Sequence, residues 1–144
     1  MARIKLTLPE SFSFSASIPV RITDLNYGGH VGNDAILSLL HEARVQYLQS
    51  LHFTELDFAG TSLIMSDVAI EFKNELFYGS ELKVYVTAGD FTKAGFDLYY
   101  ELLIDRDGKE VTIAVAKTGM VCFNYTTRKV SPIPPEALQV LRQD

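Results

Sequence analysis

The sequence lacks several features that disulfide-bonded, membrane-spanning and secreted proteins require. It contains one cysteine among 144 residues, Cys122, so no internal disulfide can form and nothing demands an oxidising compartment. No apolar run approaches the roughly 20 residues of a membrane-spanning helix, and the start of the sequence shows no secretory signal. We therefore expect a cytoplasmic protein without a membrane partner.

Positive charge is also scarce. Thirteen lysines and arginines stand against eighteen acids, which gives a net charge of −5. Without a basic run, nucleic acid is not an expected partner. His41 and His52 lack the spacing of metal ligands, and Gly28-Gly29 lacks the spacing and the lysine of a phosphate-binding loop. We expect neither a metal ion nor a bound cofactor.

What is present is the composition of an ordinary globular domain. Hydrophobic residues make up 47% of the chain and charged residues 22%. No internal repeat and no Pro/Gly-rich linker divides it. At this length one core buries most of the apolar surface. We expect residues 1–144 to form a single domain.

The hydrophobic pattern predicts a strand, a long helix and then four strands. Residues 11–23 alternate as an opening strand does, and residues 34–51 follow a helical period without internal proline or glycine. The later elements are predicted at residues 62–73, 80–91, 95–104 and 110–125 for strands, 105–108 for a hairpin turn and 134–142 for a short helix. The fold class is α+β, with an antiparallel sheet of about five strands folded around one helix.

The long helix carries one broad apolar face, with Glu42 at one edge of the stripe and Arg44 at the other. The face comprises Ala35, Ile36, Leu39, Leu40, Ala43, Tyr47 and Leu51. A carboxylate beside a buried stripe needs a partner. Glu42 is therefore either paired with an arginine such as Arg21 or Arg44, or a catalytic acid.

The loop before this helix concentrates the candidate chemistry. Residues 24–33 hold three glycines and two asparagines and lead into a helix start. A helix N-terminus presents unpaired N–H donors that stabilise a developing oxyanion. His30 lies in this loop, and histidine is the usual general base near neutral pH. Asp24 is either a turn cap or a carboxylate that serves His30.

The run from Val20 to Arg44 resembles the signature of the 4-hydroxybenzoyl-CoA thioesterase branch of the hotdog superfamily. That signature has Asp-x-Asp, then Gly-His-Val, a small residue, Asn, and a helix with Glu-x-Ala-Arg or Glu-Ala-Arg. The chain has Asp24, the run Gly29-His30-Val31-Gly32-Asn33 and the run Glu42-Ala43-Arg44 in these places. The likeness continues through residues 116–118 and 121–123 into the tail at 126–136.

This resemblance implies a curved hotdog sheet around the long helix, and hydrolysis of an acyl-CoA or acyl-carrier-protein thioester. It implies a homodimer that joins two sheets edge to edge, often assembled into a homotetramer, with the active site at the dimer interface. Coenzyme A would enter only as part of the substrate. Backbone N–H groups of about Val31 to Asn33 would polarise the carbonyl. The substrate-binding residues would be Tyr27, Gly29, Val31, Gly32 and Asn33.

One position departs from the family pattern. Asp24 matches the first acid of Asp-x-Asp, but Asn26 stands where the family carries its attacking carboxylate. An amide is neither a base nor a useful nucleophile. The segment is also similar to one in the plant acyl-carrier-protein thioesterases, which has Asp, Asn and His at alternate positions. In that comparison Asn26 again stands in place of the acid, Gly28 stands in place of the Asn, and His30 is the same residue.

We therefore expect catalytic roles among Asp24, Asn26, His30 and Glu42, with water as the nucleophile. Asn26 is either a ligand of water or of the thioester oxygen, or a loop residue without a catalytic task. Two alternatives to hydrolysis remain open. One is a hydratase or dehydratase of acyl thioesters that uses His30 and Glu42, and the other is a non-catalytic protein that binds acyl thioesters.

Overall fold

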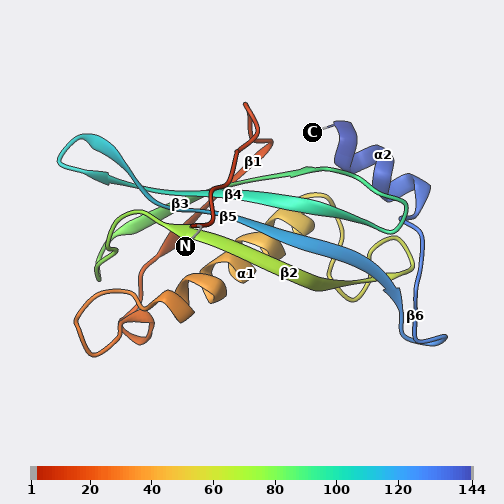
Figure 1. Cartoon of the computed structure of the whole chain (residues 1–144), viewed down its shortest axis with the longest axis horizontal. Helices are drawn as coiled ribbons and strands as arrows, with labels where there is room; N and C mark the ends of the chain where they lie inside the picture. Colours follow the sequence, from red (N-terminus) through yellow and green to blue (C-terminus); the bar gives the residue numbers. More distant parts are fainter. Residues whose placement is uncertain (1–2, 144) are drawn as a thin grey trace.

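The computed structural model describes residues 3–143, and in it one long helix packs against an antiparallel sheet (Figure 1). In chain order the elements are β1 (Phe14–Pro19), the 3-10 turn η1 (Ile22–Asp24), α1 (Asn33–Ser50), β2 (Ser62–Phe72), β3 (Glu81–Gly89), β4 (Gly95–Arg106), β5 (Lys109–Asn124), β6 (Lys129–Val130) and α2 (Pro135–Gln143). The predicted α+β layout is confirmed. Among the described residues, no helix is long and apolar enough to cross a membrane.

The differences from the predicted elements lie at their ends. The opening strand, predicted over residues 11–23, is limited to β1, because the chain after Pro19 turns into η1. The short strand β6, which pairs with the end of β5, was not predicted, since two residues carry no period. The turn before β5 is confirmed, and Asp107 and Gly108 have φ angles of 55° and 80°, as a type I′ turn requires.

The strand order places β1 and β2 at the two edges of the sheet. The order is β1-β3-β4-β5-β2, and neighbouring strands are antiparallel throughout. Helix α1 lies on one face, and the segment before β1 crosses the other face, where the Leu6 N–H donates to Glu71 Oε1 at 2.7 Å (Figure 1). Helix α2 lies at the end of the sheet where β4 begins, since the Ile133 N–H donates to Lys93 O. Among the described residues no strand pairs with the outer edge of β2, although the Leu63 N–H near its start donates to Glu55 O at 2.7 Å.

The core lies between α1 and the facing side chains of the sheet. Its helical part comprises Ile36, Leu39, Leu40, Ala43, Tyr47 and Leu48, all buried. Cys122 is fully buried, as predicted, and burial raises the pKa of its thiol to about 11. These contacts fix the direction of α1 and so the place of its first turn.

The two polar residues at the edges of the apolar stripe are not placed as the sequence predicted. Arg44 is only 5% exposed, because it lies one helical turn from Leu40 and Leu48 on the buried face. Its Nη1 donates to the Tyr100 hydroxyl at 3.4 Å, and its Nε lies 3.6 Å from a carboxylate oxygen of Glu55. Glu42 is exposed and forms no ion pair with Arg44 among the described residues. Of the two arginines expected as its partner, it acts on Arg21, whose guanidinium pKa is raised by the hydrogen bond and charge of Asp24 and, in smaller part, by the charge of Glu42.

We predict that Gly95→Ala destabilises the fold, because a methyl group on Gly95 would overlap the Met120 carbonyl oxygen of the neighbouring strand. Overpacking of this kind costs about 1–3 kcal/mol. Gly89→Ala is the matched control, since the nearest atom to its methyl group would be Tyr99 Cε2 at 3.6 Å. Urea denaturation midpoints measure both; equal midpoints would contradict the predicted close approach.

Candidate active site at the start of helix α1

Backbone hydrogen bonds close the loop between η1 and α1 into a compact turn. The Asn26 N–H donates to His30 O at 2.8 Å, and the Gly29 N–H donates to Asn26 O at 3.2 Å. Leu25 and Val31 form an isolated β-bridge across the base of this turn. Gly29 has a φ of 83°, which glycine adopts without strain. The turn therefore brings Asn26 and His30 together at the helix start.

The first turn of α1 leaves two N–H donors open. Val31 donates its N–H to Leu76 O at 2.8 Å, and Gly32 donates its own to Asp24 O at 3.3 Å. Helical bonding begins with the Ala35 N–H, which donates to Gly32 O at 3.0 Å. Within residues 3–143 the N–H groups of Asn33 and Asp34 meet no acceptor. Of the predicted donors from Val31 to Asn33, only Asn33 is therefore open, and Asp34 adds a second.

His30 presents a ring nitrogen with a free lone pair. Its Nδ1 lies 3.2 Å from Val31 O, and a carbonyl oxygen can only accept, so Nδ1 carries the hydrogen in this contact. In the neutral ring Nε2 is then unprotonated. A methyl group on Gly28 would lie 3.6 Å from that Nε2, which places the nitrogen on the Gly28 side of the loop. His30 thus offers a base to the space beside the helix start.

Asn26 shapes the loop with its side chain. Its Oδ1 accepts the Gly28 N–H at 2.8 Å, an Asx turn. The same oxygen would lie 3.2 Å from a methyl group on Gly28. The side chains of Asn26 and His30 therefore both border the side of Gly28 on which a methyl group would lie. The structure brings these two predicted site residues together.

Asp24 is occupied by contacts within its own turn. It is 5% exposed, and its Oδ2 accepts the Arg21 N–H at 2.9 Å while its Oδ1 lies 3.2 Å from Arg21 Nη2. The hydrogen bond to this carboxylate raises the pKa of the Arg21 guanidinium. These contacts support the prediction of a turn cap rather than that of a proton carrier.

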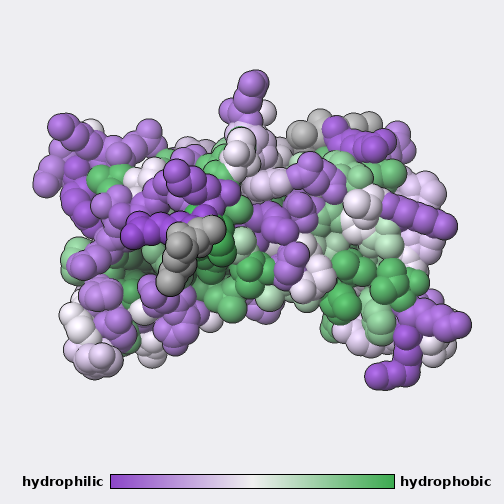
Figure 2. Space-filling model, viewed as in Figure 1, coloured by the Kyte–Doolittle hydropathy of each residue, from purple (hydrophilic) through white to green (hydrophobic). Residues whose placement is uncertain are grey.

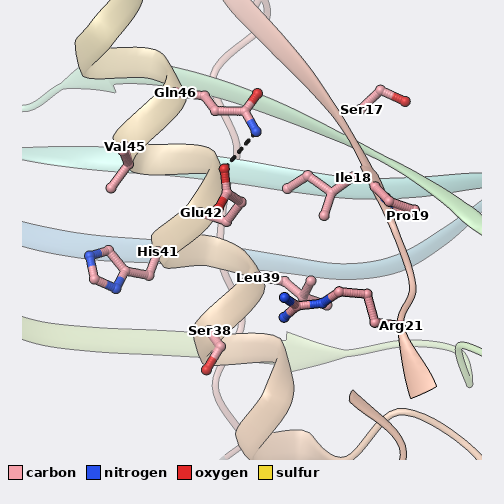
Figure 3. A pocket seen from close by; sticks show the side chains of 10 residues that line it. All are labelled: Ser17, Ile18, Pro19, Arg21, Ser38, Leu39, His41, Glu42, Val45 and Gln46. Carbon is pink, nitrogen blue, oxygen red and sulfur yellow. Dashed lines mark hydrogen bonds between the residues drawn. The ribbon is translucent and has the colours of Figure 1, made fainter. Parts of the chain in front are cut away.

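Glu42 lies in a different hollow, between β1 and the outward side of α1 (Figure 3). This pocket has a volume of about 360 Å³ and includes Arg21, Ser38, His41 and Gln46 in its lining. Glu42 Oε2 accepts a hydrogen bond from Gln46 Nε2 at 2.7 Å (Figure 3). The pocket that Glu42 lines and the pocket that His30 lines have no residue in common. Within one protomer, Glu42 and His30 therefore do not belong to the same pocket.

The pocket beside His30 is small, with a volume of about 70 Å³. Part of its lining comes from residues 72–76, which the sequence did not predict to belong to the site. Phe72 at the end of β2, followed by Asn74, Glu75 and Leu76, lines it opposite His30 and Asn33. No local pattern pairs residues 72–76 with the loop before α1. Only the non-local bond from Val31 to Leu76 does so. Tyr27, predicted to bind substrate, is fully exposed at the tip of the loop.

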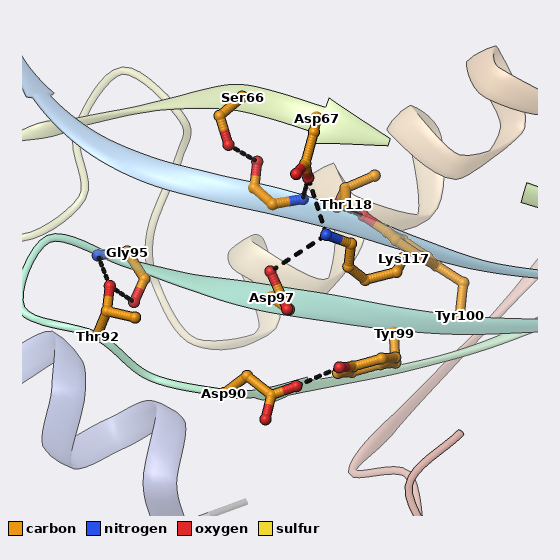
Figure 4. A network of polar contacts seen from close by, with 11 residues as sticks. Ser66, Asp67, Asp90, Thr92, Gly95, Asp97, Tyr99, Tyr100, Lys117 and Thr118 are labelled. Carbon is orange, nitrogen blue, oxygen red and sulfur yellow. Dashed lines mark hydrogen bonds and ion pairs between the residues drawn. The ribbon is translucent and has the colours of Figure 1, made fainter. Parts of the chain in front are cut away.

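A second polar network lies on the opposite face of the sheet (Figure 4). Lys117 Nζ lies 3.0 Å from Asp67 Oδ1 and 3.8 Å from Asp97 Oδ1, and the Tyr99 hydroxyl donates to Asp90. Burial raises the pKa of Asp97, the hydrogen bond to Asp67 raises that of Lys117, and the bond to Asp90 raises that of Tyr99 to about 12. These cross-strand contacts stabilise the sheet and are separate from the loop before α1.

Comparison with known proteins gives a consistent set of matches. The model of the thioesterase-like superfamily matches residues 20–141. A 1,4-dihydroxy-2-naphthoyl-CoA hydrolase of Microcystis aeruginosa is 28% identical over 118 residues, which are 80% of this chain and 83% of that protein.

Solved structures agree on the fold. A 1,4-dihydroxy-2-naphthoyl-CoA thioesterase from Synechocystis superposes with a TM-score of 0.79 at 25% identity, over 91% of this chain and 96% of its own. A thioesterase from Thermus thermophilus, in complex with coenzyme A and zinc, gives a TM-score of 0.76 at 20% identity, over 94% and 96%. The curved sheet around one helix is thus the hotdog fold.

We predict that Asp24 matters for stability. Asp24→Ala removes charge-assisted hydrogen bonds from a buried carboxylate and lowers the free energy of unfolding by about 2 kcal/mol. Arg21→Ala is the milder control, because the arginine side chain is 67% exposed and such pairs contribute about 1 kcal/mol or less. Urea denaturation compares them. An Asp24→Ala variant with the wild-type midpoint but no activity would instead favour a catalytic role.

Proposed function

The chain belongs to the thioesterase-like superfamily, and we propose that it hydrolyses acyl-CoA thioesters to a carboxylic acid and free coenzyme A. The observation that carries this proposal is the pair of open N–H donors at Asn33 and Asp34, with Asn33 in the same pocket as His30, whose Nε2 is left as an acceptor when Nδ1 donates to Val31 O. A thioester carbonyl needs such donors when its oxygen gains charge, and attack on its carbon needs a base nearby.

The thioester oxygen is bound at the first turn of α1. Its developing negative charge faces two N–H groups and the positive end of the helix dipole. Gly32, the residue before the helix, has no side chain that caps these donors. Electrostatic stabilisation by one such donor contributes about 3–4 kcal/mol to catalysis in hydrolases.

Water is the nucleophile, since Asn26 cannot form an acyl intermediate. His30 Nε2 takes one proton from the water as its oxygen bonds to the thioester carbon. The tetrahedral intermediate then breaks its C–S bond, and the leaving thiolate takes that proton from the imidazolium. The contact of Nδ1 with Val31 O keeps the ring in the tautomer this requires.

An aromatic acyl group is the proposed substrate class. Two relatives, at 28% and 25% identity, are named for 1,4-dihydroxy-2-naphthoyl-CoA. Phe72 supports this choice, because it is 50% exposed and borders the pocket beside His30. An aromatic ring stacks favourably against such a side chain. A 4-hydroxybenzoyl group belongs to the same class, and a carrier-protein thioester remains the alternative for the thiol portion.

The protein acts as a homodimer joined through β2. This strand has 11 residues and lies at the edge of the sheet, with Met65, Val68 and Phe72 between 38% and 50% exposed. Figure 2 shows hydrophobic side chains interrupted by hydrophilic ones in the region of this strand, and the Asp67 side chain in its middle is 61% exposed. An open apolar edge is a template for pairing with a second chain. Since Phe72 also borders the His30 pocket, the partner would cover the site.

No observation favours the hydratase alternative over hydrolysis. That reaction would require His30 and Glu42 in one site, and within a protomer they line different pockets. A protein that binds acyl thioesters without hydrolysing them is distinguished by assay.

We predict that the wild type releases thiol from benzoyl-CoA or 1,4-dihydroxy-2-naphthoyl-CoA, and that His30→Gln lowers kcat about 100-fold or more through loss of the general base. Thiol release is followed with a chromogenic disulfide. His41→Gln is the control, since His41 is an exposed histidine paired with Glu55. Binding of these thioesters without turnover by the wild type would favour the non-catalytic alternative.

We also predict that Val68→Glu yields a monomer, because it introduces charge into the apolar edge of β2. Val130→Glu is the matched control, an exposed valine on β6 that is 58% exposed. Sedimentation velocity reports both masses. A monomeric wild type, or a Val68→Glu variant that remains dimeric, would rule out pairing through β2.

A further inference from the structure

One carboxylate at the helix start has no partner. Asp34 is exposed in the first turn of α1, and its side chain forms no hydrogen bond or ion pair with any residue between 3 and 143. Asp24 is occupied by Arg21, and Glu42 is bonded to Gln46 in the other pocket. Among these three acids, Asp34 alone is both free and next to the open N–H donors.

The Asp34 side chain turns back over the residue that precedes the helix. A methyl group on Gly32 would lie 2.6 Å from Asp34 Oδ1 and 3.5 Å from Asn26 Cβ. Gly32 has a φ of −72°, which any residue adopts, so its backbone does not demand glycine. The missing side chain instead leaves room for the carboxylate beside Asn26.

Asn26 therefore has a neighbour on each side that can accept a hydrogen bond or a proton: the His30 imidazole and the Asp34 carboxylate. Its Oδ1 and His30 Nε2 border Gly28, and its Cβ and Asp34 Oδ1 border Gly32. The amide oxygen of Asn26 is used by the Gly28 N–H. His30 thus lies on the Gly28 side of Asn26, and the Asp34 carboxylate lies on its Gly32 side, in the first turn of the helix.

We propose that Asp34 is a further catalytic residue, whose carboxylate holds the attacking water while His30 takes its proton. This proposal rests on the proposed hydrolysis. One hydrogen of the water goes to His30 Nε2, and the other is hydrogen-bonded to Asp34 as the oxygen bonds to the thioester carbon. Asp34 stays ionised throughout, and that second hydrogen leaves as a proton from the carboxylic acid product.

The position also suits the charges. A carboxylate is stabilised at a helix N-terminus, and Asp34 lies in the first turn of α1. Its negative charge in turn stabilises the imidazolium that forms on His30. Two groups that fix one water remove much of the entropy cost of bringing it to the carbon.

The test compares thiol release from benzoyl-CoA and 1,4-dihydroxy-2-naphthoyl-CoA by four proteins: wild type, Asp34→Asn, Glu136→Gln and the double variant Asn26→Asp/Asp34→Asn. We expect Asp34→Asn to lower kcat about 100-fold with KM within about threefold, the size of effect expected when the attacking water is no longer held in position. Glu136, the acid in the first turn of α2, controls for helix-start charge and should leave kcat unchanged. Urea midpoints check folding.

The double variant gives the sharper readout. It moves the carboxylate from one side of the shared space to position 26, so we expect it to recover at least about tenfold in kcat over Asp34→Asn. An Asp34→Asn variant that keeps more than about a third of the wild-type kcat, a change too small for a group that holds the water, overturns the role of Asp34 alone. A wild type that releases no thiol from either substrate overturns the proposed hydrolysis and Asp34 with it.

Discussion

The arrangement of the site depends on how the chain enters α1. The Val31 N–H is held by Leu76 O and the Gly32 N–H by Asp24 O, so the two residues before the helix are pinned to the β2–β3 connection and to η1. Gly32 then supplies only its carbonyl oxygen to the first turn. With no capping side chain, the donors of Asn33 and Asp34 remain open. The open donor pair is thus a consequence of these two backbone bonds.

The hydrophobic periodicity of the sequence predicted the helices and most of the strands, but it did not predict the contacts between them. The helical period placed α1 within one residue at each end, and the apolar face from Ile36 to Tyr47 is the buried one. The same period does not say that Glu55 and Tyr100 approach Arg44, so the burial of that charge was missed. Likewise, the segment at Leu76 joins the site through sheet pairing over a long separation in sequence, which periodicity does not report.

The sequence was sufficient to locate the loop that carries the motif. It was not sufficient to assign a role to each residue in that loop. Asp24 and Asn26 stand at the two acid positions of the Asp-x-Asp pattern that the sequence resembles, yet both side chains here accept backbone N–H groups of their own turns. Short polar side chains do this wherever the chain bends. A carboxylate used as a cap cannot also serve as a base without breaking that cap. A motif position therefore identifies the site but not the atom that acts.

Gly28 and Gly32, unlike Gly29, are not explained by the backbone conformation of this loop. Gly29 is explained by its backbone, since its φ is 83°. Gly28 and Gly32 have no positive φ, and what a side chain there would meet is Asn26 Oδ1 and His30 Nε2 in one case and Asp34 Oδ1 in the other. A loop selected only to reach the helix would have no need of small residues at both places. The space that a side chain would take at these two positions is filled by an amide, an imidazole and an unpaired carboxylate, so the two glycines pack these polar groups closely at the start of α1.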